Sequence, residues 1–286
     1  MLEPLYDLIS WLLPGELGQL AFLQRALVAG LFLALAAGIL GVGVVGHRLS
    51  YYSNAVGHST FAGVAVGVLS GVSPYLALVG FAVLVGLAIT ALRRRGTLAT
   101  DTVVGVVFAT VMALGIALLS AYRGLGRELA TYIYGDLLTI SDAEVHLTLA
   151  ALILTVVFSI LYYNKLTLTA VSPAVARAAG VRVAALEYVH AALIAAVVAV
   201  AVRAVGILFV SALLILPAAA ARNLARRQST MFWWAAGLGA AAAVGGILLS
   251  LALDTATGAT IILLGAFFFG LSLLAARLRG KPGRRG

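Results

Sequence analysis

Asn54 and His58 are the two side chains whose type and spacing best suit cation binding. They stand four positions apart, which places them one turn from each other on a helix. A neutral imidazole and an amide oxygen are both ligands for divalent metals, and an ionisable residue inside an apolar segment of membrane-crossing length is a functional candidate by default. Two ligands from one helix turn are too few to hold a metal, so other helices would have to contribute. A histidine here can instead simply hydrogen-bond a neighbouring helix, and the residues alone leave both interpretations open.

A stripe of small residues follows on the same predicted helix. Ser59, Gly63, Gly67 and Gly71 are spaced four apart, and small residues at that interval let two helix backbones approach closely. We therefore expect this face to pack against another helix.

The loop 164–185 contains a second candidate functional element. Ser172 and Pro173 have the residue types of an N-cap and a first helical position, and Gly180 is typical of the position just after a helix end. The sequence therefore predicts a helix of about two turns, carrying Arg177, between two membrane segments. Such a rigid element suits docking to a separate motor protein, although an ordinary interfacial loop helix has the same features.

Several catalytic and nucleotide-binding motifs are absent from the sequence. It has no G-x-x-x-x-G-K-[ST] phosphate loop, no G-x-S-x-G and no H-E-x-x-H. A serine-type membrane protease would need a glycine two positions before Ser70, where the chain has Val68. There is no cysteine, so thiolate metal ligands are excluded. We expect a protein that is not an enzyme and that does not bind ATP through a phosphate loop.

The composition is that of a polytopic membrane protein. The chain has 286 residues, of which 63% are hydrophobic and 10% are charged. Apolar stretches of about 17 to 25 residues recur along the chain, and this is the length that a helix needs to cross a bilayer. The sequence therefore predicts an all-α transmembrane bundle of about eight or nine segments, near 20–46, 55–71, 74–92, 103–121, 145–163, 186–203, 204–220, 232–253 and 258–277. Ser141 and Glu144 have capping-box spacing before one of these segments, and Asp101 is placed to cap another that begins at Val103.

The apolar run 186–220 is predicted to be two segments that turn at Arg203. A single helix would bury this arginine in the middle of the bilayer, at a cost of several kcal/mol. With a turn there, one side of the membrane holds 15 of the 19 Lys and Arg residues, and by the positive-inside rule that side is the cytoplasm. The 15 are Arg48, Arg93, Arg94, Arg95, Lys165, Arg177, Arg182, Arg222, Arg226, Arg227 and five residues after Ala276. The net charge of +9 is thus an orientation signal and predicts no nucleic-acid partner.

Three regions follow from this organisation. Residues 1–19 form an acidic N-terminal segment at the membrane interface, where Trp11 and Leu12 precede Pro14, and it does not resemble a cleavable signal peptide. Residues 20–277 form the transmembrane domain, with the short helix near 173–180. Residues 278–286 form a basic cytoplasmic tail. We expect a multi-pass protein of the cell membrane, in contact with lipid, with its C-terminus in the cytoplasm.

Ordered motifs along the chain resemble a known family, the zinc and manganese permeases of the ABC-3 type. The resemblance covers about residues 20 to 277 and lies in the stretches Arg48–Tyr52, Gly57–Ser59, Gly63–Gly67, Asp101–Gly105, Ala113–Gly115, Tyr134–Leu138, Ser172–Val181, Val205–Leu208 and Ser211–Ala219. It implies a permease that pairs with a second copy or a homologue, works with two cytoplasmic ATPase subunits and receives its ion from an extracytoplasmic metal-binding protein.

The resemblance also implies roles for individual residues. His58, Asn54 and Asp254, the last at the final outer turn, would belong to the translocation pathway. The short helix would be the coupling helix that docks on the ATPase, formed by Ser172, Pro173, Arg177, Ala178, Ala179 and Gly180. No cofactor would be bound permanently, because the metal, Zn²⁺ or Mn²⁺ with Fe²⁺ as a further candidate, is the transported substrate.

Asn54 departs from the pattern of this family. Its members commonly carry an aspartate four residues before the histidine, and an amide oxygen is a weaker ligand for a hard cation than a carboxylate. The departure puts the strength and the metal preference of the site in question. Two alternatives remain, a permease for a metal chelate and a secondary carrier or channel that needs no ATPase. A carrier would be expected to have several carboxylates at mid-membrane, whereas the acids of this chain gather in loops and at segment ends.

Overall fold

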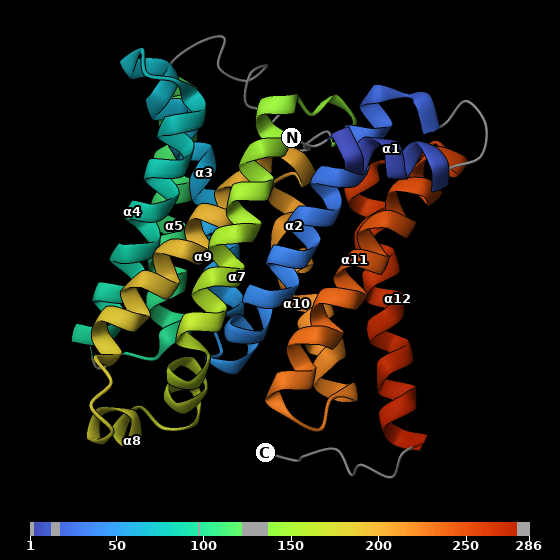
Figure 1. Ribbon diagram of the computed structural model, residues 1–286. Coiled ribbons are helices and arrows are strands. Elements are labelled where there is room, and N and C mark those ends of the chain that lie inside the picture. Colours follow the sequence, from blue (N-terminus) through green and yellow to red (C-terminus); the bar gives the residue numbers. More distant parts are fainter. Residues whose placement is uncertain (1–2, 13–17, 97, 122–136, 279–286) are drawn as a thin grey trace. The chain divides into compact units, whose positions relative to one another are not determined.

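The structure, a computed structural model, describes residues 3–12, 18–96, 98–121 and 137–278. These residues are almost entirely helical and include no strand (Figure 1). The helices are α1 (Glu3–Leu12), α2 (Ala21–Gly46), α3 (Ser50–Ser70), α4 (Pro74–Arg95), α5 (Thr100–Ala121), η2 (Leu137–Thr139), α7 (Asp142–Val171), α8 (Pro173–Ala178), α9 (Val183–Val205), α10 (Ile207–Leu224), α11 (Gln228–Leu253) and α12 (Thr257–Leu278). The all-α membrane fold predicted from the sequence is confirmed.

Seven helices in the described ranges are long and apolar enough to cross a membrane: α2, α4, α5, α7, α9, α11 and α12. Each of the nine predicted segments coincides with one helix, and the two outside the seven are α3 and α10. The first half of α3 is rich in Tyr, Ser, Asn and His, which lowers its hydropathy. Helix α10 is 18 residues long and carries a basic residue, Arg222, in its last turn. The count of eight to nine segments is therefore approximate.

The predicted break within 186–220 is present, and it lies at Gly206, three residues after the predicted turn at Arg203. Helix α9 ends at Val205, and Gly206 has φ 87°, a conformation that glycine adopts without the penalty of a Cβ. Helix α10 begins at the next residue. Arg203 is exposed in the last turn of α9, where a basic side chain also interacts favourably with the helix dipole. Two helices thus replace one long helix with an arginine at its centre.

Three helix boundaries differ from the prediction. Helix α3 begins at Ser50 and not near Ala55, because Arg48, with φ 57°, reverses the chain directly after α2. Helix α7 continues to Val171, so the predicted loop 164–185 begins with two further helical turns. Helix α5 begins at Thr100, which places Asp101 in its first turn and not before it. There its carboxylate still complements the positive end of the helix.

The predicted capping box at the start of α7 is confirmed. The Glu144 carboxylate accepts from the backbone N–H of Ser141 at 2.9 Å and from its hydroxyl at 2.7 Å. In return, the Glu144 N–H donates to the Ser141 hydroxyl oxygen at 3.4 Å. The pair satisfies donors that a helix start leaves without partners.

The chain divides into two compact units. The first comprises residues 1–42, 136–156 and 212–286, and the second comprises residues 43–135 and 157–211. In the first unit α2 and α11 touch through their backbones: a Cβ on Gly38 would lie 2.7 Å from the Ala235 carbonyl oxygen, and one on Gly239 would lie 2.9 Å from that of Ala34. In the second unit α3 is central, because it contacts α4, α5 and α9.

Candidate functional site

Asn54 and His58 lie on the central helix of the second unit, and both side chains are half-buried. Because α3 begins at Ser50, His58 is eight residues into the helix, about 12 Å along its axis. Its imidazole meets the ring of Phe108 on α5 edge to face, with the ring centroids 5.3 Å apart and the planes at 80°. This contact restrains the orientation of the imidazole.

These two side chains do not form a complete metal site by themselves. In the part of the chain that the structure describes, no group of three or more His, Cys, Asp or Glu residues is placed to hold a metal ion. Asp254, the third predicted pathway residue, belongs to the first unit, where it is exposed and ends α11 with φ 51°. The arrangement therefore provides one nitrogen and one oxygen ligand, and further ligands must come from elsewhere.

The small residues of α3 lie where α4 packs against it. A Cβ on Gly63 would be 2.8 Å from the Cβ of Phe81, and one on Gly67 would be 2.6 Å from the Cβ of Ala77. Ser59 is fully buried, and its hydroxyl donates to the Val56 carbonyl at 2.7 Å. Gly71 differs from the other three: it has φ 68°, caps the end of α3 and has no neighbour within 4 Å of a Cβ built on it. The stripe thus holds α3 closely against α4 and fixes the position of His58.

Helix α8 has the ends that the sequence predicts. The Ser172 hydroxyl accepts from the Val175 N–H at 3.3 Å, and Pro173 occupies the first helical position. After the helix, Gly180 has φ 78°, and the Val181 N–H donates to the Ala176 carbonyl at 3.0 Å. This pattern matches a Schellman ending, which fixes the direction of the chain as it enters α9.

The two sides of α8 differ sharply. Ala176 is fully buried, and α8 contacts α9. Arg177, Ala178 and Ala179 are exposed, and so is Val175, at 55%. The exposed surface therefore combines two alanines, one valine and a positive charge, on an element held in place from its other side.

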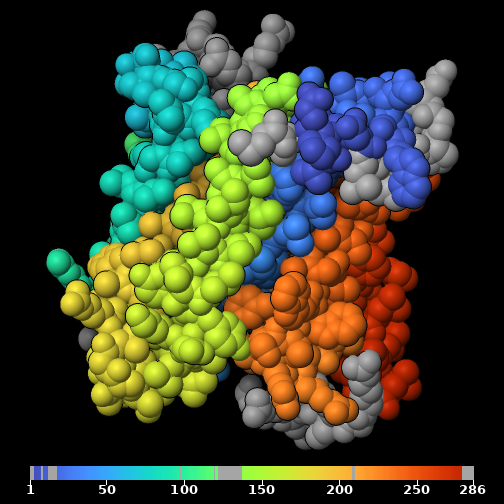
Figure 2. Space-filling view, viewed as in Figure 1, coloured from blue at the N-terminus to red at the C-terminus, as the bar shows by residue number. Residues whose placement is uncertain are grey.

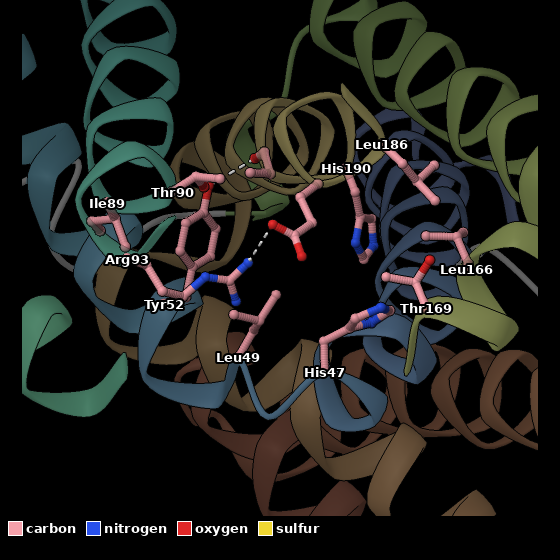
Figure 3. Close-up of a pocket in the computed structure, with 12 residues that line it drawn as sticks. His47, Leu49, Tyr52, Ile89, Thr90, Arg93, Leu166, Thr169, Leu186 and His190 are labelled. Carbon is pink, nitrogen blue, oxygen red and sulfur yellow. Dashed lines mark hydrogen bonds and ion pairs between the residues drawn. The ribbon is translucent and has the colours of Figure 1, made fainter. Parts of the chain in front are cut away.

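The structure also contains a polar pocket that the sequence analysis missed (Figure 3). The His47 and His190 rings meet edge to face there, with their centroids 5.6 Å apart and their planes at 61°. Glu187 forms ion pairs with Arg93 at 3.4 Å and Arg94 at 2.7 Å, which tie α9 to the end of α4. The Tyr52 hydroxyl donates to the Ala191 carbonyl at 2.8 Å and so joins α3 to the same place. His190 is an ionisable residue within an apolar segment, the same signal that singled out His58.

The polar pocket is arranged to hold helices together and not to bind a cation. Its cavity is about 10 Å³, which is at most the room that one water requires. The Arg93 guanidinium lies among its polar groups and repels any positive ion. Burial lowers the pKa of His47, and the nearby Arg93 charge lowers it further, whereas the hydrogen bond to the Gly43 carbonyl opposes the shift. The pocket therefore favours a neutral His47 imidazole beside an ion-pair cluster in which one carboxylate meets two arginines.

Some sequence predictions fall outside the described residues. These are Pro14 in the N-terminal segment, most of the motif Tyr134–Leu138, and the tail after Leu278. Leu137 and Leu138 are described and form part of η2.

A family model described as the ABC 3 transport family matches residues 19–276. The chain belongs to the ABC 3 transport family. This result confirms the resemblance drawn from the ordered motifs, and the matched range has nearly the same limits as the predicted domain.

Curated relatives of this ABC 3 transport chain match most of its length. It is 32% identical over 248 residues to the high-affinity zinc uptake system membrane protein ZnuB of Haemophilus influenzae, a match that covers 87% of this chain and 95% of that protein. It is 30% identical over 260 residues to the manganese transport system membrane protein MntC of Halalkalibacterium halodurans, covering 91% of this chain and 89% of that protein.

Two solved structures share the fold. PsaBC from Streptococcus pneumoniae, solved in complex with Fab, has a chain that matches with a TM-score of 0.79 and 25% identity over 95% of both chains. An inward-facing conformation of a metal-chelate type ABC transporter matches with a TM-score of 0.74 over 96% of this chain and 97% of that one. The second match is 14% identical, so the likeness is one of fold alone.

Proposed function

We propose that this chain is the membrane permease of an ATP-binding-cassette importer for a bare divalent metal ion, Zn²⁺ or Mn²⁺. The observation that carries the proposal is the match to the ABC 3 transport family over residues 19–276, together with relatives of nearly full length that are named for zinc and manganese. Fe²⁺ is a further candidate, because the same nitrogen and oxygen ligands accept it.

The half-buried pair on α3 is the proposed contact with the ion in transit. His58 offers an imidazole nitrogen and Asn54 an amide oxygen, and neither carries a negative charge that would hold the ion tightly. A translocation site must release its ion, so a neutral and incomplete ligand set suits passage better than a closed site. The remaining ligands would come from a second permease copy or from water.

The proposed partners follow from the absence of a phosphate loop in the sequence and from the form of α8. Two cytoplasmic ATPase subunits would supply the energy, with α8 seated on them through Ala178 and Ala179. An extracytoplasmic metal-binding protein would deliver the ion on the opposite side, and Asp254 would lie near that entrance. The N-terminal segment 1–19 would rest at the membrane interface and the tail 278–286 in the cytoplasm.

Reconstitution tests this function directly. The chain is co-expressed with a candidate ATPase and reconstituted in proteoliposomes with the binding protein, and uptake of ⁶⁵Zn²⁺ and ⁵⁴Mn²⁺ is measured with and without ATP. We expect uptake that requires ATP and both partners. Uptake of equal rate without the ATPase would show a secondary carrier, and transport of a chelated metal in place of the bare ion would show a chelate permease.

A further inference from the structure

A second cavity lies in the same unit, where α7, the turn after α8 and the start of α9 meet (Figure 1). Its volume is about 360 Å³, far more than the polar pocket offers. It is lined by two basic side chains, one phenol and several apolar groups: Tyr162, Lys165, Gly180, Val181, Arg182, Ala185, Leu186 and Val189.

The two basic residues carry positive charge that the protein does not neutralise. Within the described ranges neither Lys165 nor Arg182 forms an ion pair, and the nearest acid along α9, Glu187, is engaged by Arg93 and Arg94. The Lys165 Nζ lies 5.2 Å from the centre of the Tyr162 ring, a cation–π contact that holds the ammonium group beside the cavity. Both basic side chains are exposed, so an anion can reach them.

Apolar surface leads up to each of these charges. On α7, Val157, Leu161 and Lys165 are spaced four apart and share one face, and the first two are 47% and 68% exposed. On α9, Ala185 and Val189 follow Arg182 at helical spacing, and Val189 is 52% exposed. In Figure 2 the lower part of α7, in green, is uncovered on the face shown. Exposed apolar faces on membrane helices contact lipid tails, so each face runs from the hydrocarbon to a cation.

The two basic residues lie at the depth in the membrane where lipid headgroups are found. Lys165 follows the predicted membrane segment 145–163, and Arg182 precedes the segment 186–203. Basic pockets between membrane helices at this level are suited to anionic lipid headgroups. A phosphate group placed between the two cations would gain charge-assisted hydrogen bonds, while its acyl chains lay along Val157, Leu161 and Val189.

We propose that this cavity binds the headgroup phosphate of an anionic phospholipid. The site is separate from the ion pathway on α3. Gly180 and Val181 line the cavity and directly follow α8. If α8 docks on the ATPase as proposed above, a bound lipid would therefore stabilise the position of the coupling helix. The binding itself does not depend on that role.

Lipid binding is measured first, without any transport assay. The purified chain is placed in nanodiscs of phosphatidylcholine with increasing phosphatidylglycerol, and its thermal stability and the phosphatidylglycerol retained in native mass spectra are recorded. The double variant Lys165→Gln/Arg182→Gln is compared with Arg222→Gln/Arg226→Gln, which removes the same charge from the first unit. A cation in contact with an anionic headgroup contributes about fivefold to its binding, so we expect the first variant to weaken binding roughly 25-fold. Arg222 and Arg226 do not line this cavity, so we expect the control to weaken binding at this site little.

Two further arms separate this ligand from other anions. In pure phosphatidylcholine, millimolar inorganic phosphate should not reproduce the stabilisation, and if it does, the site takes a free anion and the lipid proposal is wrong. Equal loss of phosphatidylglycerol from both double variants would also overturn it. If the first variant keeps its lipid but no longer binds the ATPase, the two cations serve a protein partner. A chain that binds the lipid at this site but transports no metal would contradict only the proposed function.

Discussion

The ligand pair on α3 is unusual in holding no charge of its own. His58 is restrained by Phe108, and Asn54 lies one turn away on the same helix, so in the proposed site both side chains sit on one rigid element before an ion arrives. Preorganised ligands reduce the entropy lost on binding, whereas neutral ligands limit the affinity for the metal ion. We therefore expect His58 to matter most for passage of the ion and Asn54 to matter most for its release.

Replacing His58 with Ala tests the first role. We expect uptake per assembled complex to fall by about tenfold or more, because loss of a metal ligand exceeds the loss seen for outer-shell partners. Thermal stability should change little, since the imidazole is only half-buried. Full uptake with lowered stability would instead show that His58 serves only to pack α3 against α5.

Replacing Asn54 with Asp tests the second role. The carboxylate adds a negative charge beside the imidazole, so Zn²⁺ or Mn²⁺ should bind more tightly and leave more slowly. We expect a lower Kd by equilibrium dialysis together with slower turnover, and Asn54→Gln, which stays neutral, is the control. An unchanged Kd in the aspartate variant would exclude this position from the ion pathway.

Gly86 on α4 allows a packing prediction with an internal control. A Cβ there would strike the hydroxyl of Tyr52, a rigid side chain that is 2% exposed and bonded to the Ala191 carbonyl. Overpacking of this kind costs about 1–3 kcal/mol, which exceeds the gain of about 1 kcal/mol from a better helix former. We expect Gly86→Ala to lower the Tm in detergent, and Gly80→Ala, with open space around its Cβ, to leave it equal or raised. A similar rise in the Tm of both variants would show that the Tyr52 side chain moves freely.

Elements whose ends are determined by nearby residues could be predicted from the sequence. Ser141 with Glu144 and Ser172 with Pro173 each act within a few positions, so the capping box and α8 were recognisable. The α9–α10 break was recognisable from the cost of burying Arg203 in the bilayer. The start of α3 was not, because it depends on Arg48 taking a positive φ, for which arginine gives no signal. The polar pocket was missed for another reason: His47, Arg93 and Glu187 are far apart in the sequence and meet only in the folded unit.

Helix α8 is the element on which a motor subunit would dock. One of its faces packs against the rest of the unit, and the other is exposed. Ala176 seats the helix on α9, whereas Ala178 and Ala179 are exposed. We expect Ala178→Trp to leave the Tm and membrane insertion unchanged while abolishing metal-dependent stimulation of the ATPase, because the bulky ring prevents close seating. Ala178→Ser keeps the small volume and should retain stimulation. If the tryptophan variant is stimulated like the wild type, α8 is an ordinary interfacial helix.

On the scale of the whole molecule, the open question is which end of each helix faces the cytoplasm. The uneven distribution of 15 and 4 basic residues predicts that the α10–α11 turn and the C-terminus are inside. Helix α11 runs for 26 residues between Gln228 and Leu253, about 39 Å, which exceeds the hydrocarbon thickness of a bilayer. If α11 crosses the membrane, its two ends therefore lie on opposite faces of the bilayer.

The chain contains no cysteine, so single cysteines report their side of the membrane without background. We place one at Ser229 and one at Thr255, both exposed and at opposite ends of α11, and a third at Gly286. A membrane-impermeant maleimide added to intact cells should label Thr255→Cys alone, whereas Ser229→Cys and Gly286→Cys should react only after permeabilisation. The reverse pattern would place the arginine-rich side, and with it α8, outside the cell, where no ATPase could reach it. Labelling of both α11 positions in intact cells would mean that this helix does not cross the membrane. The three positions together thus test the orientation on which the coupling role of α8 and the lipid site both depend.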